Sequence, residues 1–230
     1  MQPVLIPPGA PIRFPDPRFA DHEGLVAVGG DLLPERLLAA YDHGIFPWYS
    51  EGYPPLWWCP DPRAILPLDA VRISRSMRRR LRHTDFEVTW NRCFERVVDE
   101  CGAGRSEGTW LTPEMTRAYT TLRHLGHAHS LEVWHDARLV GGLYGVQRGG
   151  LFAAESMFHR QTDMSKVALL YCCSSLLNAG VGLLDVQFLT PHLASLGARE
   201  ISRKEYLHRV RVERERRIDL NHLQLVSPLS

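Results

Sequence analysis

The sequence has almost no lysine, few cysteines and no long apolar run, and each shortage excludes a class of protein. Of 27 basic residues among 230, only Lys166 and Lys204 are lysines, and the formal net charge is +1. This balance excludes a strongly basic nucleic-acid binder, so any RNA contact must come from local clustering. The five cysteines include no CxxC pair. They fit reduced thiols in a cytoplasm better than a disulfide framework or a zinc site.

Targeting segments and common catalytic motifs are also absent from the sequence. The longest apolar run, residues 167–173, is far shorter than the roughly 18 residues that a membrane helix needs. The first residues have no basic segment and are broken by prolines, unlike a signal peptide. The eleven histidines show no HExxH spacing, and no GxSxG, Walker or GxGxxG motif occurs. We therefore expect a cytoplasmic protein without a metal, a cofactor or a membrane partner.

The composition of the chain changes near residue 62. Residues 1–62 are rich in Pro, Gly and Trp, and they contain one predicted helix, from Pro34 to His43. The prolines and tryptophans between residues 46 and 62 favour an irregular, loop-built surface over regular structure. We therefore expect a small N-terminal α/β domain over residues 1–62 and a second domain over 63–230.

Regular periodicity begins after residue 62. Predicted helices start at the capping residues Ser74, Asn91 and Thr112. Further predicted elements are strands 129–135, 138–147 and 151–158, a buried helix over 165–179, a strand over 183–189, and short helices over 191–196 and 202–211. Helices followed by three meandering strands, a helix and another strand indicate an α+β, mixed-sheet domain.

Polar residues interrupt two of the predicted strands. Alternation places Glu155 on one face of strand 151–158 with Leu151, Ala153 and Met157. A lone carboxylate there costs several kcal/mol unless it is paired or protonated. Glu155 is therefore either a structural carboxylate paired with an arginine or a functional group.

The second interrupted strand is 183–189. Asp185 and Gln187 share one face of this strand, roughly 7 Å apart. They either satisfy backbone groups of nearby loops or line a polar hole in an apolar site. If this strand lies beside strand 151–158, Glu155, Asp185 and Gln187 converge.

Arginines cluster on the predicted helix after Ser74. Four of them, at i, i+3, i+4 and i+7, fall on one face: Arg75, Arg78, Arg79 and Arg82. Such a face either engages phosphates or is simply a solvated surface.

Several segments, in order, resemble the bacterial leucyl/phenylalanyl-tRNA–protein transferase family. The segments that carry the resemblance are Gly24 to Leu32, Gly44 to Trp48, Trp57-Trp58, Pro60 to Arg63, Ile73 to Met77, Glu107 to Trp110, Gly126 to Ser130, Glu155 to Phe158 and Ala194 to Gly197. The resemblance implies a GNAT-like (acetyltransferase-type) core for the larger domain. It also implies transfer of leucine or phenylalanine, and with less selectivity methionine, from leucyl-tRNA or phenylalanyl-tRNA to an N-terminal Arg or Lys of a protein. The product would carry a destabilising N-terminal residue for N-degron proteolysis.

The resemblance also assigns roles to residues. Glu155, Asp185 and Gln187 match the positions that line the reaction site. Trp48 and Trp110 resemble tryptophans around the terminal adenosine and aminoacyl group. Leu143 and Met157 fall in the aminoacyl pocket, and Leu143 departs from the methionine usual in the family. Within this family the face formed by Arg75, Arg78, Arg79 and Arg82 becomes a candidate contact for the tRNA acceptor stem.

Two assignments of roles to the polar residues of the site are possible. In the first, the Gln187 carbonyl accepts a hydrogen bond from the attacking amine, Asp185 orients Gln187, and Glu155 attracts the cationic acceptor or organises the site. In the second, Asp185 and Glu155 both bind the acceptor cation, and the tRNA ribose hydroxyl assists proton transfer. Two carboxylates near the acceptor favour Arg and Lys over acidic N-termini.

Other functions fit the sequence less well. An acetyl-CoA-dependent acetyltransferase needs a glycine-rich pyrophosphate turn, and residues 159–165 contain no glycine. A non-catalytic RNA-binding module has no need of polar residues on buried strands.

Overall fold

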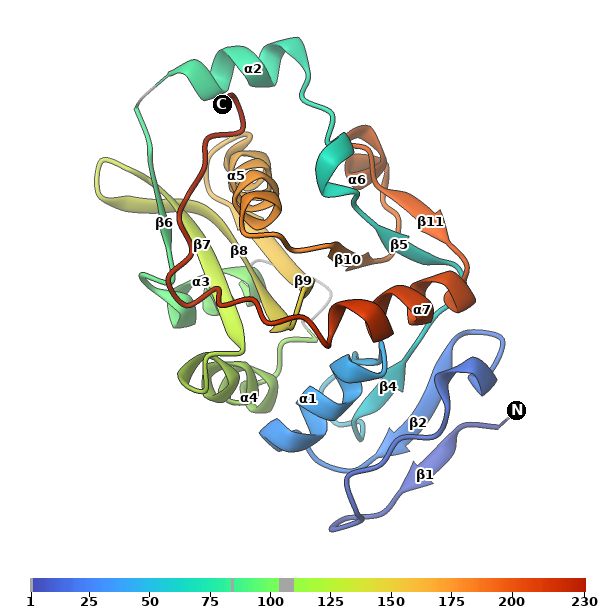
Figure 1. The fold of residues 1–230 in the computed structure, drawn as a ribbon. Coiled ribbons are helices and arrows are strands. Elements are labelled where there is room, and N and C mark those ends of the chain that lie inside the picture. The colour runs from blue at the N-terminus through green and yellow to red at the C-terminus, as the bar shows by residue number, and fades with distance from the viewer. Residues whose placement is uncertain (1, 84, 104–109) are drawn as a thin grey trace.

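Two mixed β-sheets form the framework of the molecule in this computed structural model, which describes residues 2–83, 85–103 and 110–230 (Figure 1). The smaller sheet has the order β1-β2-β4-β3, with β1 Val4–Ile6, β2 Leu25–Gly29, β3 Phe46–Pro47 and β4 Leu56–Trp58. The larger sheet has the order β11-β5-β10-β9-β8-β7-β6. Its strands are β5 Arg63–Ile65, β6 Glu87–Trp90, β7 Ala128–His135, β8 Arg138–Arg148, β9 Leu151–His159, β10 Leu183–Gln187 and β11 Arg199–Ile201. The predicted α+β, mixed-sheet class is confirmed.

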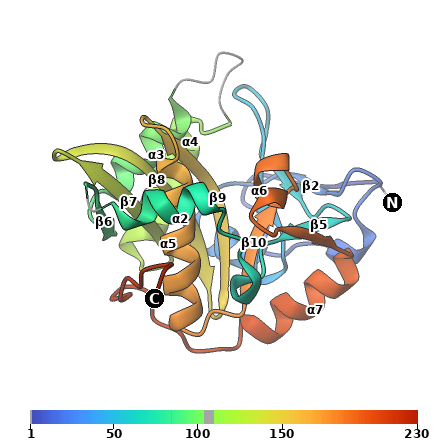
Figure 2. The same cartoon turned by 90° about the horizontal axis from the view of Figure 1, so that it is seen from above.

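Helices cover both faces of the larger sheet (Figure 2). The helices are α1 Pro34–Asp42, α2 Arg75–Arg82, α3 Phe94–Gly102, α4 Pro113–His124, α5 Met164–Asn178, α6 Pro191–Ser195 and α7 Arg203–Glu213, with 3-10 turns at Pro17–Phe19 and Leu68–Ala70. Helix α5 packs on β7, β8 and β9 and is buried on most sides, as its apolar sequence predicts. No helix in the described part of the chain has the length and apolarity to cross a membrane.

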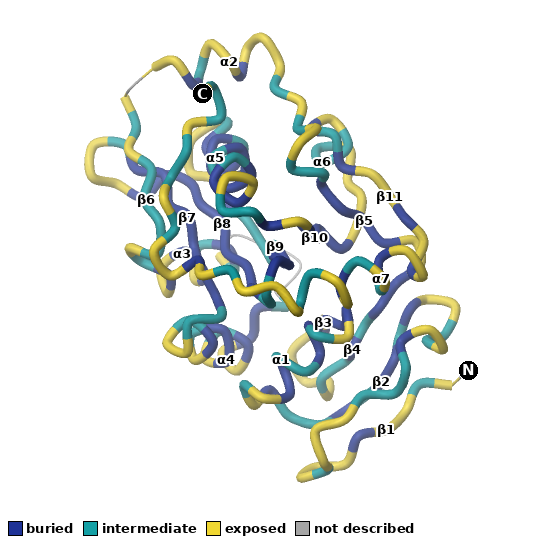
Figure 3. Tube along the Cα trace, viewed as in Figure 1, coloured by how far each residue is buried: buried dark blue, intermediate teal, exposed yellow. Residues whose placement is uncertain are grey.

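The hydrophobic core lies on both faces of the central strands, where Figure 3 shows the chain buried. On one face, α5 packs with buried residues such as Leu143 and Phe152. On the other face, α3 and α4 share one continuous cluster with the N-terminal segment, whose Trp57 is fully buried. The chain passes from the smaller to the larger sheet between Trp58 and Arg63, but the core crosses that point. A domain boundary at residue 62 stays a prediction.

Most predicted elements after residue 62 are confirmed to within two residues. Ser74 caps α2 by accepting the Met77 N–H, and Thr112 caps α4 in the same way. Asn91 does not cap α3, which has Cys93 as its N-cap and begins at Phe94. Asn91 instead adopts a left-handed conformation with φ 60°, and its side chain accepts the Ser130 N–H. Asparagine tolerates this conformation. Because its side chain accepts a hydrogen bond from β7, it does not cap the helix.

The prediction of an irregular surface over residues 46–62 is wrong in part, because β3 and β4 lie within this segment. These strands have only two and three residues, and Pro47 stands in β3 at the edge of the sheet, where a proline removes no ladder hydrogen bond. The sequence pattern also does not predict five other short strands, which are β1, β2, β5, β6 and β11.

Candidate active site

Glu155 occupies a β-bulge in the middle of β9. The register of β9 with β8 shifts there: Ser156 faces Tyr144 and Ala154 faces Gly145, so Glu155 is the extra residue. A bulge turns the side chains that follow it to the opposite face. The predicted alternation holds as far as Glu155, because Ala153 and the Glu155 partner Tyr119 lie in the same core cluster. It is wrong beyond the bulge, because Met157 packs in the other cluster, under α5.

Two tyrosines hold the partly buried Glu155 carboxylate. The Tyr119 hydroxyl donates to Glu155 Oε2 at 3.0 Å, and the Tyr41 hydroxyl lies 3.1 Å from that of Tyr119. Burial raises the pKa of Glu155 to about 7, although hydrogen bonds from Tyr41 and Tyr119 offset part of this effect. The pKa values of Tyr41 and Tyr119 are raised by burial and by Glu155, so both stay protonated and can donate. Glu155 can therefore gain or lose its charge near neutral pH.

Asp185, on β10, is paired with an arginine in the interior. Arg63 Nε and Nη2 donate to its two oxygens at 2.9 and 2.6 Å, and the Tyr206 hydroxyl donates to Oδ2 at 2.8 Å. Arg63 and Asp185 are each only 1% exposed. Burial alone would lower the pKa of Arg63, but Asp185 raises it above its usual value, so the guanidinium stays charged. Both Asp185 oxygens are thus occupied by the protein itself.

Gln187 connects the two acids. Its backbone N–H donates to Asp185 Oδ1 at 3.0 Å, and its Nε2 lies 3.4 Å from Glu155 Oε1. β10 has a bulge between Asp185 and Gln187, and Gln187 adopts a φ of 55°. The predicted convergence of Glu155, Asp185 and Gln187 is confirmed, because β10 pairs in parallel with β9.

An aromatic cavity of about 360 Å³ opens onto Glu155 and Gln187. Its walls include Trp110, the residues Phe46 and Trp48 of the β3 region, and Phe188, which directly follows β10. Trp48 and Phe188 are each 44% exposed, and their ring centroids are 5.7 Å apart. Partly exposed rings beside buried polar groups are typical of a binding site. The Glu107 to Thr109 part of the Trp110 motif lies outside the described residues.

Leu143 and Met157 lie apart from this group. They face each other across β8 and β9, on the side of the sheet that α5 covers. Leu143 is 1% exposed, and neither residue is among the described residues that line the cavity. Their role in an aminoacyl pocket stays a prediction.

The arginines of α2 form an exposed face. Arg75, Arg78, Arg79 and Arg82 are all exposed, while Met77 and Leu81 anchor the helix to the core. None of the four pairs with an acid within the described ranges, whereas Arg80 is bound to Asp85. The face is available for an anionic partner, and its contact with tRNA stays a prediction.

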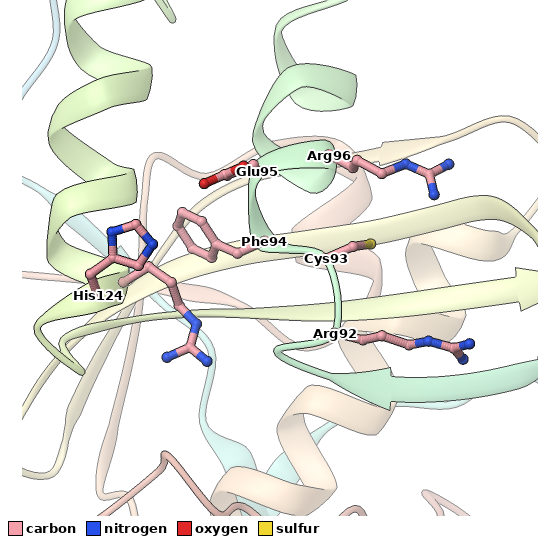
Figure 4. Close-up of a pocket in the computed structure, with 7 residues that line it drawn as sticks. Arg92, Cys93, Phe94, Glu95, Arg96 and His124 are labelled. Carbon is pink, nitrogen blue, oxygen red and sulfur yellow. The ribbon is translucent and has the colours of Figure 1, made fainter.

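A larger cavity, of about 550 Å³, lies at the start of α3 and the end of α4 (Figure 4). It shares no described lining residue with the cavity at Glu155, and Glu95 is the one carboxylate in its described lining. Burial raises the pKa of its Cys93 thiol to about 11, so Cys93 is a poor nucleophile. The smaller cavity at Glu155 is therefore the better candidate for chemistry.

Four residues of the candidate site have roles that sequence reasoning missed. Arg63, Tyr206, Tyr41 and Tyr119 all contact the site acids or each other. Arg63 precedes the apolar run Ala64 to Leu66, and a lone cation there could have been matched to the lone acid in β10. The tyrosines resemble ordinary core residues in sequence and give no such signal. In the described ranges, no group of three or more His, Cys, Asp or Glu side chains is arranged to hold a metal.

Comparison with known proteins gives matches over most of the chain. The model of the leucyl/phenylalanyl-tRNA protein transferase family matches residues 65–211, and the model of its N-terminal domain matches residues 30–61. Leucyl/phenylalanyl-tRNA–protein transferases of Salmonella newport (strain SL254) and Salmonella typhimurium (strain LT2) are each 54% identical over 198 residues, which is 85% of both chains.

Solved structures show a weaker likeness. L-PGS from Bacillus licheniformis has a TM-score of 0.41 at 15% identity, over 74% of this chain and 57% of that one. A GCN5-related N-acetyltransferase from Kribbella flavida has a TM-score of 0.39 at 10% identity, over 71% and 59%. At these TM-scores the likeness carries no conclusion about this chain.

The mixed-sheet fold and the sequence matches define an enzyme of the transferase class. The chain belongs to the leucyl/phenylalanyl-tRNA protein transferase family.

Proposed function

We propose that the enzyme transfers leucine or phenylalanine from aminoacyl-tRNA to the N-terminal Arg or Lys of acceptor proteins in the cytoplasm, without a cofactor. The observation that carries the proposal is the aromatic cavity that opens onto Glu155 and Gln187. The product would bear a destabilising N-terminal residue and enter N-degron proteolysis.

The aromatic rings suit the end of a charged tRNA. Trp48 and Phe188 offer ring faces on which the terminal adenine can stack, and such stacking contributes about 1–3 kcal/mol per base. Trp110 lies in the same cavity lining. The apolar walls would accept a leucine or phenylalanine side chain, and one methyl group gives only about 1–3 kcal/mol of discrimination. Methionine is therefore an expected minor donor, and Leu143 and Met157 are proposed to influence that preference.

The reaction needs positioning more than strong acid–base chemistry. The acceptor amine, with a reference pKa of about 7.7–8.0, attacks the ester carbonyl carbon. A C–N bond forms, the C–O bond to the ribose breaks, and one proton moves from the amine to the departing ribose hydroxyl. Holding the two reactants in place can supply roughly 7–11 kcal/mol of the barrier.

The role proposed for Gln187 is to orient the amine. Its Nε2 faces Glu155, and an ionised carboxylate can only accept hydrogen bonds. The Gln187 carbonyl is thereby directed away from Glu155, where it can accept a hydrogen bond from the attacking amine. Asp185 acts on Gln187 through its backbone N–H.

Acceptor selection is assigned to Glu155 alone. Asp185 is neutralised by Arg63 and is 1% exposed, which argues against the alternative in which Asp185 binds the acceptor cation. Glu155 lines the cavity and has tyrosine and glutamine partners, without an arginine among its hydrogen-bond donors in the described ranges. An ionised Glu155 would attract Arg or Lys and repel an acidic side chain.

The direct test combines purified protein with leucyl-tRNA labelled in the amino acid and two peptides that differ only at residue 1, Arg or Asp. We expect label on the Arg peptide alone. Label on the Asp peptide alone would preserve transfer but overturn the acceptor assignment. Label on neither peptide, from folded protein, would refute the proposed function.

A further inference from the structure

Arg63 connects three separate parts of the chain at one buried point. It begins β5, donates two hydrogen bonds to Asp185 on β10, and donates a third to the Tyr206 hydroxyl on α7. Its Nη1 lies 3.3 Å from the Gly44 carbonyl oxygen, in the turn between α1 and β3. Its guanidinium therefore joins the larger sheet, the last helix and the N-terminal segment.

Two aromatic rings enclose the Arg63 guanidinium. Its Cζ lies 4.6 Å from the centroid of the Phe46 ring and 4.4 Å from that of Tyr206. Cation–π attraction is strongest where the contact is desolvated, as it is here, and a planar guanidinium can stack on a ring as an ammonium cannot. Because Phe46 also lines the aromatic cavity, Arg63 supports one wall of that cavity while it binds Asp185.

Tyr206 completes the shell around Asp185. It is 1% exposed, and its hydroxyl accepts from Arg63 and donates to Asp185 Oδ2. Gly44 lies so close to this ring that an added Cβ would be 2.7 Å from its Cε1 atom. The ring is therefore confined, and its hydroxyl has one position relative to Asp185.

The conformation of Gln187 depends on this arrangement. A left-handed conformation is sterically unfavourable for residues other than glycine, and Gln187 has a φ of 55°. The hydrogen bond from its N–H to Asp185 Oδ1 offsets this cost only while the Asp185 carboxylate is held in place. Removing an Asp185 partner would free the carboxylate to rotate and would release the Gln187 backbone.

We infer that Arg63 and Tyr206 are positioning residues for the transfer step, which set the Gln187 amide through the buried Asp185 carboxylate and the Gln187 backbone N–H. Neither residue reaches the reacting atoms. The inference rests on the proposed function, because it assigns these residues to the reaction of the same site.

The test is a double-mutant cycle between Tyr206→Phe and Gln187→Ala, measured as the single-turnover rate of leucine transfer at saturating leucyl-tRNA. Loss of one hydrogen bond to a charged group predicts about a tenfold slower rate for Tyr206→Phe, with tRNA affinity unchanged. In the Gln187→Ala background the same change should slow the rate by less than about twofold, because the two residues act as a unit. Tyr171→Phe, a tyrosine on α5 outside this shell, is the matched control and should behave as the unmodified enzyme.

Equal slowing by Tyr206→Phe in both backgrounds, or no slowing in either, would overturn the inference. If Tyr206→Phe does not fold, Arg63→Lys can replace it in the double-mutant cycle with Gln187→Ala. Arg63→Lys keeps the positive charge but loses the planar guanidinium that makes two hydrogen bonds to Asp185. Hydrogen exchange at the Gln187 N–H separates this inference from the proposed function. Faster exchange in Arg63→Lys supports positioning even if the enzyme transfers no leucine, and unchanged exchange contradicts it.

Discussion

At the scale of single residues, the site uses two carboxylates with different surroundings. Asp185 is enclosed by Arg63 and Tyr206, and its charge is balanced inside the protein. Among the described residues, Glu155 accepts hydrogen bonds from the neutral groups of Tyr119 and Gln187, and burial raises its pKa to about 7. Two carboxylates in such different surroundings are suited to different tasks. Asp185 is suited to holding a conformation, and Glu155 to attracting a cation when it is ionised.

This difference predicts a pH-dependent acceptor preference. Raising the pH through about 7 ionises Glu155, because its pKa is raised to that value, and so strengthens binding of a cationic acceptor. The measured quantity is kcat/KM for a peptide that begins with Arg, divided by kcat/KM for the same peptide with the neutral isostere citrulline at residue 1. We expect this ratio to rise about three- to tenfold from pH 6 to 8. Ionisation of the peptide amine cancels in this ratio.

Glu155→Gln supplies the control for this measurement, since it keeps the shape of the side chain and removes the charge. The ratio should then stay flat across the same pH range. A flat ratio in the unmodified enzyme would show that Glu155 does not select the acceptor.

At the scale of elements, α2 separates its anchoring from its exposed face. Met77 and Leu81 bury one side of the helix in the core, and Ser74 caps its first turn. The opposite side presents Arg75, Arg78, Arg79 and Arg82 to solvent, where Figure 3 shows α2 largely exposed. An almost neutral chain can thus concentrate positive charge on one short helix without destabilising its core.

Replacing Arg75 and Arg79 with Gln should weaken tRNA binding in a salt-dependent way. Each lost phosphate contact is expected to reduce the slope of log affinity against log salt by about 0.7–0.9. Measuring leucyl-tRNA affinity between low and high salt gives that slope directly. The paired control replaces the exposed Arg138 and Arg217, which lie outside α2, and should leave the slope unchanged. An equal effect of both pairs, or salt-independent binding by the unmodified enzyme, would contradict the assignment of α2 to tRNA.

At the scale of the whole molecule, the candidate site lies where the two sheets meet. Phe46 and Trp48 come from the smaller sheet and the segment after it, whereas Glu155 and Gln187 come from the larger sheet. Arg63, the first residue of β5, bonds to Gly44 on one side and Asp185 on the other. The continuous core beneath α3, α4 and Trp57 makes this junction part of one packed unit. Changes that loosen the junction should therefore affect the site before they unfold the protein.

Much of the larger sheet could be predicted from the sequence. The order β7-β8-β9-α5-β10 has strong periodicity, and a strand-helix-strand crossover brings β10 beside β9. The convergence of Glu155, Asp185 and Gln187 followed from that topology. The strands of the smaller sheet have five residues or fewer and include Pro47, so local pattern could not identify them.

The finer geometry of the site could not be predicted in the same way. The bulge at Glu155 depends on the register with β8, which alternation within β9 cannot report. The left-handed conformation of Gln187 is unusual for glutamine and depends on Asp185. Arg63 and Tyr206 meet Asp185 from positions 122 and 21 residues away. Such contacts arise from tertiary structure, and a single sequence carries little sign of them.

The most direct measurement is the single-turnover rate of leucine transfer from leucyl-tRNA to an Arg peptide by Gln187→Ala, compared with the unmodified enzyme. Losing the group that orients the amine should slow transfer about a hundredfold or more, by analogy with the loss of one transition-state hydrogen bond. Gln161→Ala, at an exposed glutamine outside the cavity lining, should leave the rate unchanged. A near-normal rate for Gln187→Ala would contradict the central claim that the Asp185, Gln187 and Glu155 cluster carries the transfer.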